Sequence, residues 1–430
     1  MTKATAFAPH PPPGPLPSMV QATPESDEAW FWALLAERYW ERAAFTVAGC
    51  PLRLAVSGDE LLRALRASMA HEGGERLARV SVSIDGRTVM RDSADFLPYS
   101  GDATLEAWLD RVDGQNRGSD WTVSGTGLHA VSAPFWDHGR YLARRVTEAV
   151  GARPPGRVDV DTFIGRYSST NVGVHADGAN NLGFTLRGTK QLLTWPPDAD
   201  VPRRTSNYAS ARPSADVLVG QPGNVTYFPA PQLHVGESPD EVTVSVNVAF
   251  FVHADPVARV LDVVSAAVRE AAGDVMYPAP GEALPNELER ILDSVVAVAA
   301  SESTREYLTT SWLREVTSFG LAVARPTEVV SRLPSPDQSF RIAKDTLLMH
   351  IALPERRVFA ANGHIGQLPP VPGVDVALDL LAAGRVANSR ELAAAMDASH
   401  SDKDAETIVR ALLYRLATWG ALECLPEDAR

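Results

Sequence analysis

Between Val158 and Val252 the chain consists of brief apolar runs separated by loops rich in Pro, Gly and Asn. The runs are rich in Val, Phe, Thr and Tyr, which favour extended backbone over helix. They cover Val158 to Tyr167, Leu182 to Leu186, Gln191 to Trp195, Val217 to Val219, Val225 to Phe228 and Val242 to Val252. Short strands in this arrangement predict an antiparallel barrel or jelly roll.

The segments on both sides of these strands read mainly as helices, so the fold class is α+β. Apolar spacing predicts helices over Glu28 to Ala43, Leu61 to Met69 and Leu105 to Val112, with a strand pair over Leu77 to Met90 turning at Asp85-Gly86. Beyond Pro256 it predicts helices over Val257 to Ala271, Leu284 to Ala300 and Thr304 to Val323. Strands then follow over Phe340 to Leu353 and Arg357 to Ile365, and helices over Val376 to Leu381, Ser389 to Met396 and Ala405 to Thr418.

Composition restricts the partners and the cellular setting. The 430 residues carry a formal net charge of -13, which disfavours a nucleic-acid partner because phosphate binding needs clustered Lys and Arg. The two cysteines, Cys50 and Cys424, suggest neither a disulfide framework nor a thiolate zinc site, so we expect a cytoplasmic protein. The first residues are rich in Pro and lack the apolar core of a signal peptide, and we expect no membrane association.

His175 and Asp177, together with His234, form a candidate metal site. Residues two apart on a strand point the same way, so His175 and Asp177 can hold one ion from a single strand end. Two imidazoles and one carboxylate are the set that binds non-haem Fe(II) while leaving positions open. The same spacing recurs in His253-Ala-Asp255 and His400-Ser-Asp402, so a chance pattern of surface or core histidines is the alternative.

Three motifs in a fixed order resemble those of the JmjC and cupin-like Fe(II)/2-oxoglutarate oxygenases. The first runs from the ligand pair through an apolar strand to Gly188-Thr-Lys190 and Trp195-Pro-Pro197. The second is Gly223 to His234, and the third is the closing strand Ser245 to Phe251. The likeness is strongest to the protein hydroxylase branch, which includes asparaginyl hydroxylases and ribosomal oxygenases. The sequence departs from the pattern at Asn224, where Asp is common, and at Gln232-Leu233, where an aromatic residue is frequent.

The resemblance implies a double-stranded β-helix core and a set of site residues. His175, Asp177 and His234 would be the catalytic metal ligands. Lys190 would bind the distal carboxylate of 2-oxoglutarate, with Asn247, Tyr167, Thr170 and Asn181 as further candidates near the cosubstrate. The alternatives are that Lys190 is an ordinary exposed turn residue and that Asn247 only holds a neighbouring loop.

The implied activity is an Fe(II)- and 2-oxoglutarate-dependent dioxygenase that uses O2. In this family Asp in the second ligand position is typical of hydroxylases, whereas demethylases commonly carry Glu. We therefore expect hydroxylation of a side chain in a protein or peptide. The alternatives are hydroxylation of a free amino acid or small natural product, and a non-catalytic regulator of cupin type.

The pattern divides the chain into four regions. We expect a disordered Pro-rich tail over 1–26, a JmjC/cupin-like catalytic domain over 27–255, a helical linker or dimerisation region over 256–350 and a winged-helix-like domain over 351–430. From Val371 to Arg430 there are ten acidic and six basic residues, which suits DNA poorly. The last domain is therefore expected to dock protein or peptide, to support a homodimer, or only to cap the helical region.

Overall fold

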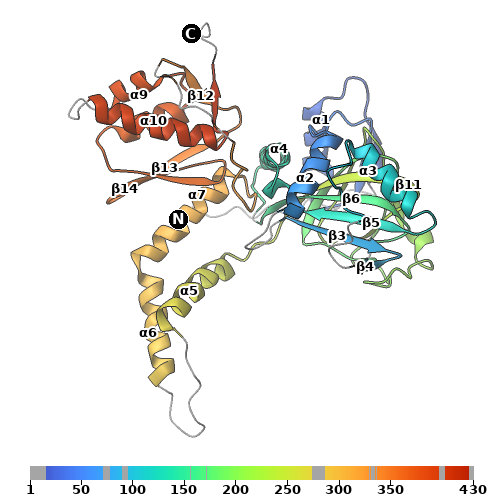
Figure 1. The fold of residues 1–430 in the computed structure, drawn as a ribbon. Coiled ribbons are helices and arrows are strands. Elements are labelled where there is room, and N and C mark those ends of the chain that lie inside the picture. Colours follow the sequence, from blue (N-terminus) through green and yellow to red (C-terminus); the bar gives the residue numbers. More distant parts are fainter. Residues whose placement is uncertain are drawn as a thin grey trace.

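The computed structural model describes residues 16–70, 78–89, 95–154, 156–170, 172–273, 286–328, 330, 335, 337–396 and 402–425. Figure 1 shows a β-rich unit, a second mixed unit near the C-terminus, and an arm of two helices extending away from both. No helix in these ranges combines the length and the apolarity needed to span a bilayer.

A large sheet dominates the β-rich unit. Its strand order is β1 (Met19–Gln21), β2 (Phe45–Ala48), β10 (Val225–Phe228), β7 (Ala179–Arg187), β11 (Leu233–Phe251), β6 (Val158–Tyr167), β5 (Trp121–Thr126), β3 (Arg79–Ile84) and β4 (Arg87–Val89). The β1–β2 pair is parallel, and the other neighbours are antiparallel. Two further strands, β8 (Lys190–Trp195) and β9 (Asp216–Gly220), add a shorter layer. The predicted antiparallel β core is confirmed.

Strand β11 belongs to both layers. Its first residues, Leu233 to Glu237, pair with β8, and its later residues pair with β6 on one side and β7 on the other. The register with β6 shifts between Ser238 and Thr243, where extra residues let the strand bend. One continuous strand therefore carries a residue of the candidate metal site at one end and lines the cavity between the layers at the other.

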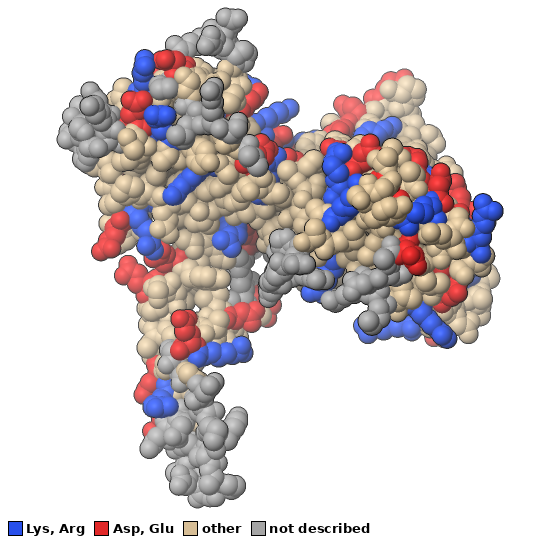
Figure 2. Space-filling view, viewed as in Figure 1, with Lys and Arg blue, Asp and Glu red and all other residues tan. Residues whose placement is uncertain are grey.

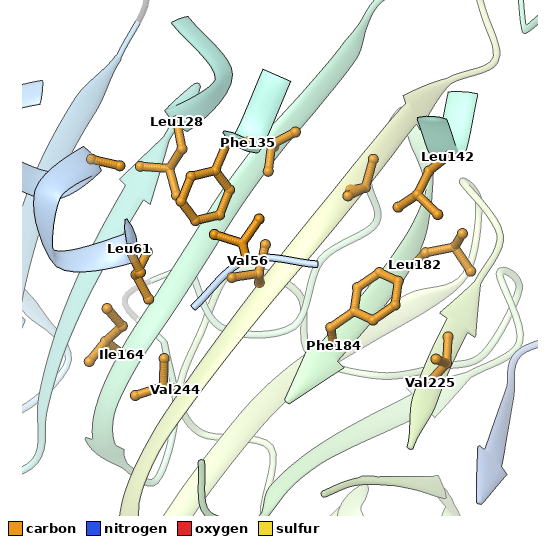
Figure 3. Close-up of a cluster of buried hydrophobic side chains, with 14 of the residues drawn as sticks. Val56, Leu61, Leu128, Phe135, Leu142, Ile164, Leu182, Phe184, Val225 and Val244 are labelled. Atoms are coloured by element: carbon orange, nitrogen blue, oxygen red, sulfur yellow. The ribbon is translucent and has the colours of Figure 1, made fainter. Parts of the chain in front are cut away.

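The apolar core lies outside the barrel, between the large sheet and the helices. Val244, Val246 and Val248 on β11 are fully buried on this outer face, whereas Ser245 and Asn247 alternate with them and face inward. Figure 3 shows this cluster, with Phe135, Leu142 and Phe184 among its members. Its helices are α1 (Glu28–Leu34), α2 (Gly58–Ala70), α3 (Leu105–Gln115) and α4 (Ala133–Val150), with the short helices η1 (Leu35–Tyr39) and η2 (Leu128–Ala130); a third, η3 (Arg212–Ser214), precedes β9.

Helix α4 was not predicted from the sequence. Its inward face includes His138, Gly139 and Arg140, all buried, so polar residues interrupt the apolar spacing that would have revealed it. The helix carries Pro134 in its first turn and ends at Gly151, which adopts a left-handed conformation with φ of 74°.

Two predicted boundaries in the first part of the chain are corrected. Residues 16–26 fall inside the expected disordered tail, yet Met19 to Gln21 form β1 and pair with β2; residues 1–15 lie outside the described ranges. The predicted helix Glu28 to Ala43 is α1 followed by the π-helical turn η1, and it stops at Tyr39. The pairing of β1 with β2 supplies backbone partners that composition alone does not reveal.

The helical middle region contains α5 (Pro256–Ala272), α6 (Asn286–Ala300) and α7 (Glu302–Thr317). Three helices were predicted here; Leu284, the predicted start of the second, lies outside the described residues. The third ends at Thr317 rather than Val323, because Phe319 and Gly320 adopt positive φ and Leu321 pairs with Val158 of the large sheet.

The C-terminal unit has a core of its own. It contains β12 (Phe340–Ile342) paired with β16 (Leu422–Cys424), the antiparallel sheet β13 (Leu348–Leu353), β14 (Arg356–Ala361) and β15 (His364–Leu368), and helices α8 (Val374–Ala382), α9 (Ser389–Ala395) and α10 (Asp402–Thr418). Phe340 and Leu348 pack in this core with Leu378 and Leu412, so the unit begins before residue 351. Its assignment as a winged helix stays a prediction.

Ion pairs and hydrogen bonds tie the C-terminal unit to α4. Arg325 forms two 2.9 Å bonds with the carboxylate of Asp137, and Nη1 of Arg140 donates to Oδ1 of Asn362 at 2.8 Å. Charged side chains of both signs are interspersed over the face of the molecule shown in Figure 2. Arg140 and Arg325 are both largely buried, so this junction is a built contact between the units.

Candidate functional site

The structure brings His175, Asp177 and His234 together at one end of the barrel. His175 and His234 lie directly opposite each other as an antiparallel pair: the amide of His175 donates to the carbonyl of His234 at 3.0 Å, and the reverse bond measures 2.8 Å. Paired residues present their side chains on the same face. The two rings accordingly lie with their centroids 4.4 Å apart.

Both imidazoles are held by Nδ1, which leaves Nε2 of each ring free to face the candidate metal position. Nδ1 of His175 lies 2.8 Å from the carbonyl oxygen of Gly173, and Nδ1 of His234 lies 3.0 Å from that of Gln232. A carbonyl oxygen only accepts, so each Nδ1 carries the proton and each Nε2 keeps its lone pair. This support from the backbone is typical of metal-binding histidines.

Asp177 completes the set. Its Oδ1 lies 3.5 Å from Nε2 of His175, and its Oδ2 lies 3.6 Å from Nε2 of His234. One ligand atom from each residue lies within 4.8 Å of the other two. Bonds of about 2.0–2.2 Å to a central ion place neighbouring ligand atoms about 3 Å apart, so small side-chain adjustments suffice. Among the described residues, this is the one cluster of three or more metal-ligating side chains found.

The surroundings favour neutral imidazole. Burial lowers the pKa of His234 to about 4, and the ring of Phe228 packs against it at 4.3 Å between centroids. A neutral histidine needs no deprotonation before it binds a metal. Asp177 supplies the negative charge and is more exposed than His234, which places the site at the mouth of the barrel.

The repeated His-x-Asp patterns do not form comparable sites. His253 and Asp255 are exposed, and the Asp255 side chain caps α5 by accepting the amide proton of Val257 at 2.9 Å. His400 lies outside the described residues. Sequence spacing therefore identified the candidate ligands only together with the third residue, His234.

Lys190 points into the barrel. Its Nζ donates to Oγ of Ser245 at 3.0 Å and lies 4.8 Å from the centroid of the Phe163 ring. Burial lowers its pKa to about 8. In the described part of the chain no carboxylate lies within ion-pairing distance of this ammonium, so a buried cation faces the cavity without a counter-charge. An exposed turn lysine would not have these surroundings.

Tyr167 and Gly236 complete the space around Lys190. The Tyr167 hydroxyl is buried and has no hydrogen-bond partner among the described residues. A Cβ added at Gly236 would meet Cε of Lys190 at 3.3 Å and the Tyr167 hydroxyl at 3.8 Å. Because glycine leaves this position empty, a small anion has room to contact both side chains. A carboxylate ligand would give the ammonium a counter-charge and the hydroxyl a hydrogen-bond acceptor.

The other predicted residues lie in different places. Asn247 lines the cavity with Lys190, and its Oδ1 lies 3.2 Å from the position of a Cβ added at Gly183. Asn181 instead lies beside the metal site: its Nδ2 donates to Oδ2 of Asp177 at 3.4 Å and to the carbonyl of Ala179 at 3.0 Å. Thr170 does not line the cavity, although its hydroxyl is buried without a partner.

Several cavity residues escaped the sequence analysis. Besides Ser245, they are Gly183, Phe184, Thr185, Leu192, Leu218, Gly220, Thr226 and Phe228. Asp161 lies opposite Asn247 in the register of β6 and β11, and burial raises its pKa to about 7. The available signal was the alternation of Val with polar residues in β11, which marks Ser245 and Asn247 as one inward face.

Among known proteins, similarity to this chain is found in solved structures. No family model matches the chain, and no curated protein matches it. The similar solved structures include those of a ribosomal oxygenase, the class that the sequence motifs resemble.

The particular protein in these structures is YcfD from Escherichia coli. One structure of it has a TM-score of 0.49 and 16% identity, covering 92% of this chain and 98% of that one. Its complex with cobalt and 2-oxoglutarate has a TM-score of 0.47, 16% identity and the same coverage. Oxalate decarboxylase from Bacillus subtilis matches 23% of each chain at 15% identity and a TM-score of 0.17. At these identities and TM-scores the likeness by itself assigns no function to the chain.

Proposed function

We propose that the protein is an Fe(II)- and 2-oxoglutarate-dependent dioxygenase with a double-stranded β-helix core, and that it hydroxylates a side chain of a protein or peptide. One observation carries this proposal. Two imidazole nitrogens and the Asp177 carboxylate converge at the mouth of a polar barrel whose interior holds an ammonium group without a counter-charge. A redox-active ion and an anionic cosubstrate explain both halves of that arrangement.

The ligand set fits Fe(II) and leaves positions open. His175, Asp177 and His234 would occupy three positions, which leaves three for the 2-oxo acid and O2. When bound, iron would couple decarboxylation of 2-oxoglutarate to oxygen transfer. The chain itself orients the ligands: the Gly173 and Gln232 carbonyls fix the imidazoles, and the Asn181 amide holds one oxygen of Asp177.

Lys190 would hold the cosubstrate at its far end. Its ammonium would bind the distal carboxylate, and the Tyr167 hydroxyl would donate a second hydrogen bond to it. A charge-assisted bond of this kind is worth about 1.5–3 kcal/mol. Ser245 already accepts one proton of the ammonium, so the direction of Nζ is set before the ligand arrives.

Turnover of 2-oxoglutarate tests this proposal. We expect succinate to form only when Fe(II), O2 and 2-oxoglutarate are all present, and a peptide library incubated with the protein to contain products heavier by one oxygen atom. Both signals should vanish in His175→Ala. If wild type and His175→Ala released equal succinate, this site would not be the catalytic one. Metal binding without any turnover would favour the non-catalytic regulator.

The helical arm supports the homodimer expected from the sequence. Among the described residues, large apolar side chains are exposed along α5 and α6: Val257 (64%), Val260 (41%), Leu261 (59%), Leu292 (57%), Val295 (37%) and Val296 (70%). The arm extends away from both units (Figure 1), so neither unit covers this face. A second copy offers the same apolar surface about a two-fold axis, and we assign it as the occupant.

Placing a charge on the arm should separate the copies. Val296→Asp would bury a carboxylate in the apolar contact, at a cost of about 3 kcal/mol or roughly 100-fold in self-association. Light scattering should report a dimer for the wild type and a monomer for Val296→Asp. Ala297→Asp is the matched control, because Ala297 is also exposed but projects about 100° further round the helix. A monomeric wild type would contradict the assignment.

A further inference from the structure

A second cavity lies next to the mouth of the barrel, apart from the one that contains Lys190. Its volume is about 310 Å³. It forms where the end of the large sheet meets α7, and its lining includes Gly156, Arg157, Ser311, Arg314, Glu315 and Gly320.

The sheet side of this cavity lies close to the metal ligands. Phe251, at the end of β11, pairs with Ala179, which follows Asp177 by two residues. Two hydrogen bonds of 2.9 Å lie on the other side of β11. The amide of Gly156 donates to the carbonyl of Phe251, and the amide of Phe251 donates to the carbonyl of Arg157. Neighbouring strands lie about 4.8 Å apart, so Arg157 is about 10 Å from Ala179.

Helix α7 and the turn after it form the opposite side. The amide of Val158 donates to the carbonyl of Gly320 at 2.9 Å, and Leu321 pairs with Val158 as a parallel bridge. These bonds fix the last two turns of α7, with Ser311, Arg314 and Glu315, against the barrel. The cavity is therefore a built feature of the fold.

Guanidinium groups outnumber carboxylates here. Arg157 lies 4.2 Å from the Phe251 ring centroid and pairs with Asp159 at 2.7 Å. Arg153, next to Gly320, pairs with Glu315, yet its Nη1 is buried and has no partner in the part of the chain that the structure describes. Arg314 is exposed and forms no ion pair within the described residues. Of the residues that line the cavity, Arg157 and Arg314 are cationic and Glu315 is anionic, in a chain whose net charge is -13.

We propose that this cavity binds a carboxylate side chain of the substrate polypeptide, while the residue to be hydroxylated lies at the metal site. The inference rests on the proposed function and specifies the substrate further. An extended chain advances about 3.3 Å per residue, so a span of about 10–15 Å places the Asp or Glu three to five residues from the hydroxylated position. Arg314 would pair with that carboxylate, and Nη1 of Arg153 lies 3.4 Å from the position of a Cβ added at Gly320, which lines the cavity.

A synthetic peptide library tests this specificity in two ways. Hydroxylated members are identified by mass after incubation with Fe(II) and 2-oxoglutarate. Separately, the library is passed over the immobilised full-length protein without iron or cosubstrate, and the retained peptides are sequenced. Arg314→Glu is compared with Arg305→Glu, an exposed arginine on the same helix whose position nine residues earlier places it on the opposite face.

We expect both fractions to be enriched in Asp or Glu three to five residues from one common position. Arg314→Glu should reduce the use of acidic peptides by about tenfold and shift the preference to Lys or Arg, whereas Arg305→Glu should behave like the wild type. Hydroxylated peptides without acidic enrichment would overturn the inference and leave the proposed function standing. If no peptide is hydroxylated, the proposed function fails, and acidic enrichment in the retained fraction alone then decides whether the cavity binds carboxylates.

Discussion

Asp177→Ala should abolish iron binding at micromolar concentrations and with it all turnover. The substitution removes the one charged ligand, whose oxygens lie 3.5 and 3.6 Å from the two Nε2 atoms, and leaves two neutral imidazoles. We expect affinity for Fe(II) to fall at least about 100-fold, which corresponds to about 2.7 kcal/mol. Metal analysis after anaerobic loading and gel filtration measures this loss.

The duplicated motif provides the matched control for this experiment. His175→Ala should lose iron as Asp177→Ala does, whereas His253→Ala should keep it, because His253 is exposed and belongs to no cluster of three or more metal-ligating side chains among the described residues. The apo forms of all three should unfold near the wild-type temperature, since none of these side chains belongs to the apolar core. Wild-type iron content in Asp177→Ala would remove this residue from the site.

Lys190→Met should raise the 2-oxoglutarate concentration needed for half-maximal turnover by roughly 10- to 100-fold, the equivalent of one charge-assisted bond. Iron affinity should stay unchanged, because Lys190 does not contact the ligands. Lys344→Met, which alters an exposed lysine, should leave both constants unchanged. Equal cosubstrate requirements in the two variants would show that Lys190 has no part in cosubstrate binding.

The same lysine predicts a pH dependence and a stability effect. Burial lowers its pKa to about 8, so in the free protein the ammonium is lost as the pH rises above about 8. The requirement for 2-oxoglutarate should increase over that range, and less so in Lys190→Arg.

The wild-type protein buries a cation without a counter-charge at pH 7. The free energy of unfolding of Lys190→Met, measured by urea denaturation, should therefore be about 1–3 kcal/mol higher than that of the wild type. A less stable apo variant would show that the lysine is structural.

The sequence indicated the candidate ligands more clearly than their surroundings. Short local motifs, which can be read directly from the sequence, contain His175, Asp177, His234 and Lys190. Gly236 and Ser245, in contrast, become neighbours of Lys190 only through the register of β11 against its partners, and that register depends on a shift between Ser238 and Thr243. Local spacing does not determine such a bend.

The regions at the edge of the barrel show the same limit. Helix α4 escaped prediction because buried Arg140 finds its partner in Asn362, more than two hundred residues later, so a polar residue occupies an inward position. Asn181 was placed with the cosubstrate by motif, and the structure puts it beside Asp177. In each case a distant contact, absent from the local pattern, decides where the side chain points.

Alternate residues of β11 serve two separate purposes: Val244, Val246 and Val248 hold the sheet to its helices, while Ser245 and Asn247 face the opposite way. A mutation at an inward position can therefore alter which molecule is accepted without weakening the framework. Such a division favours evolutionary diversification and laboratory redesign alike, because libraries restricted to the inward residues should yield mostly folded variants.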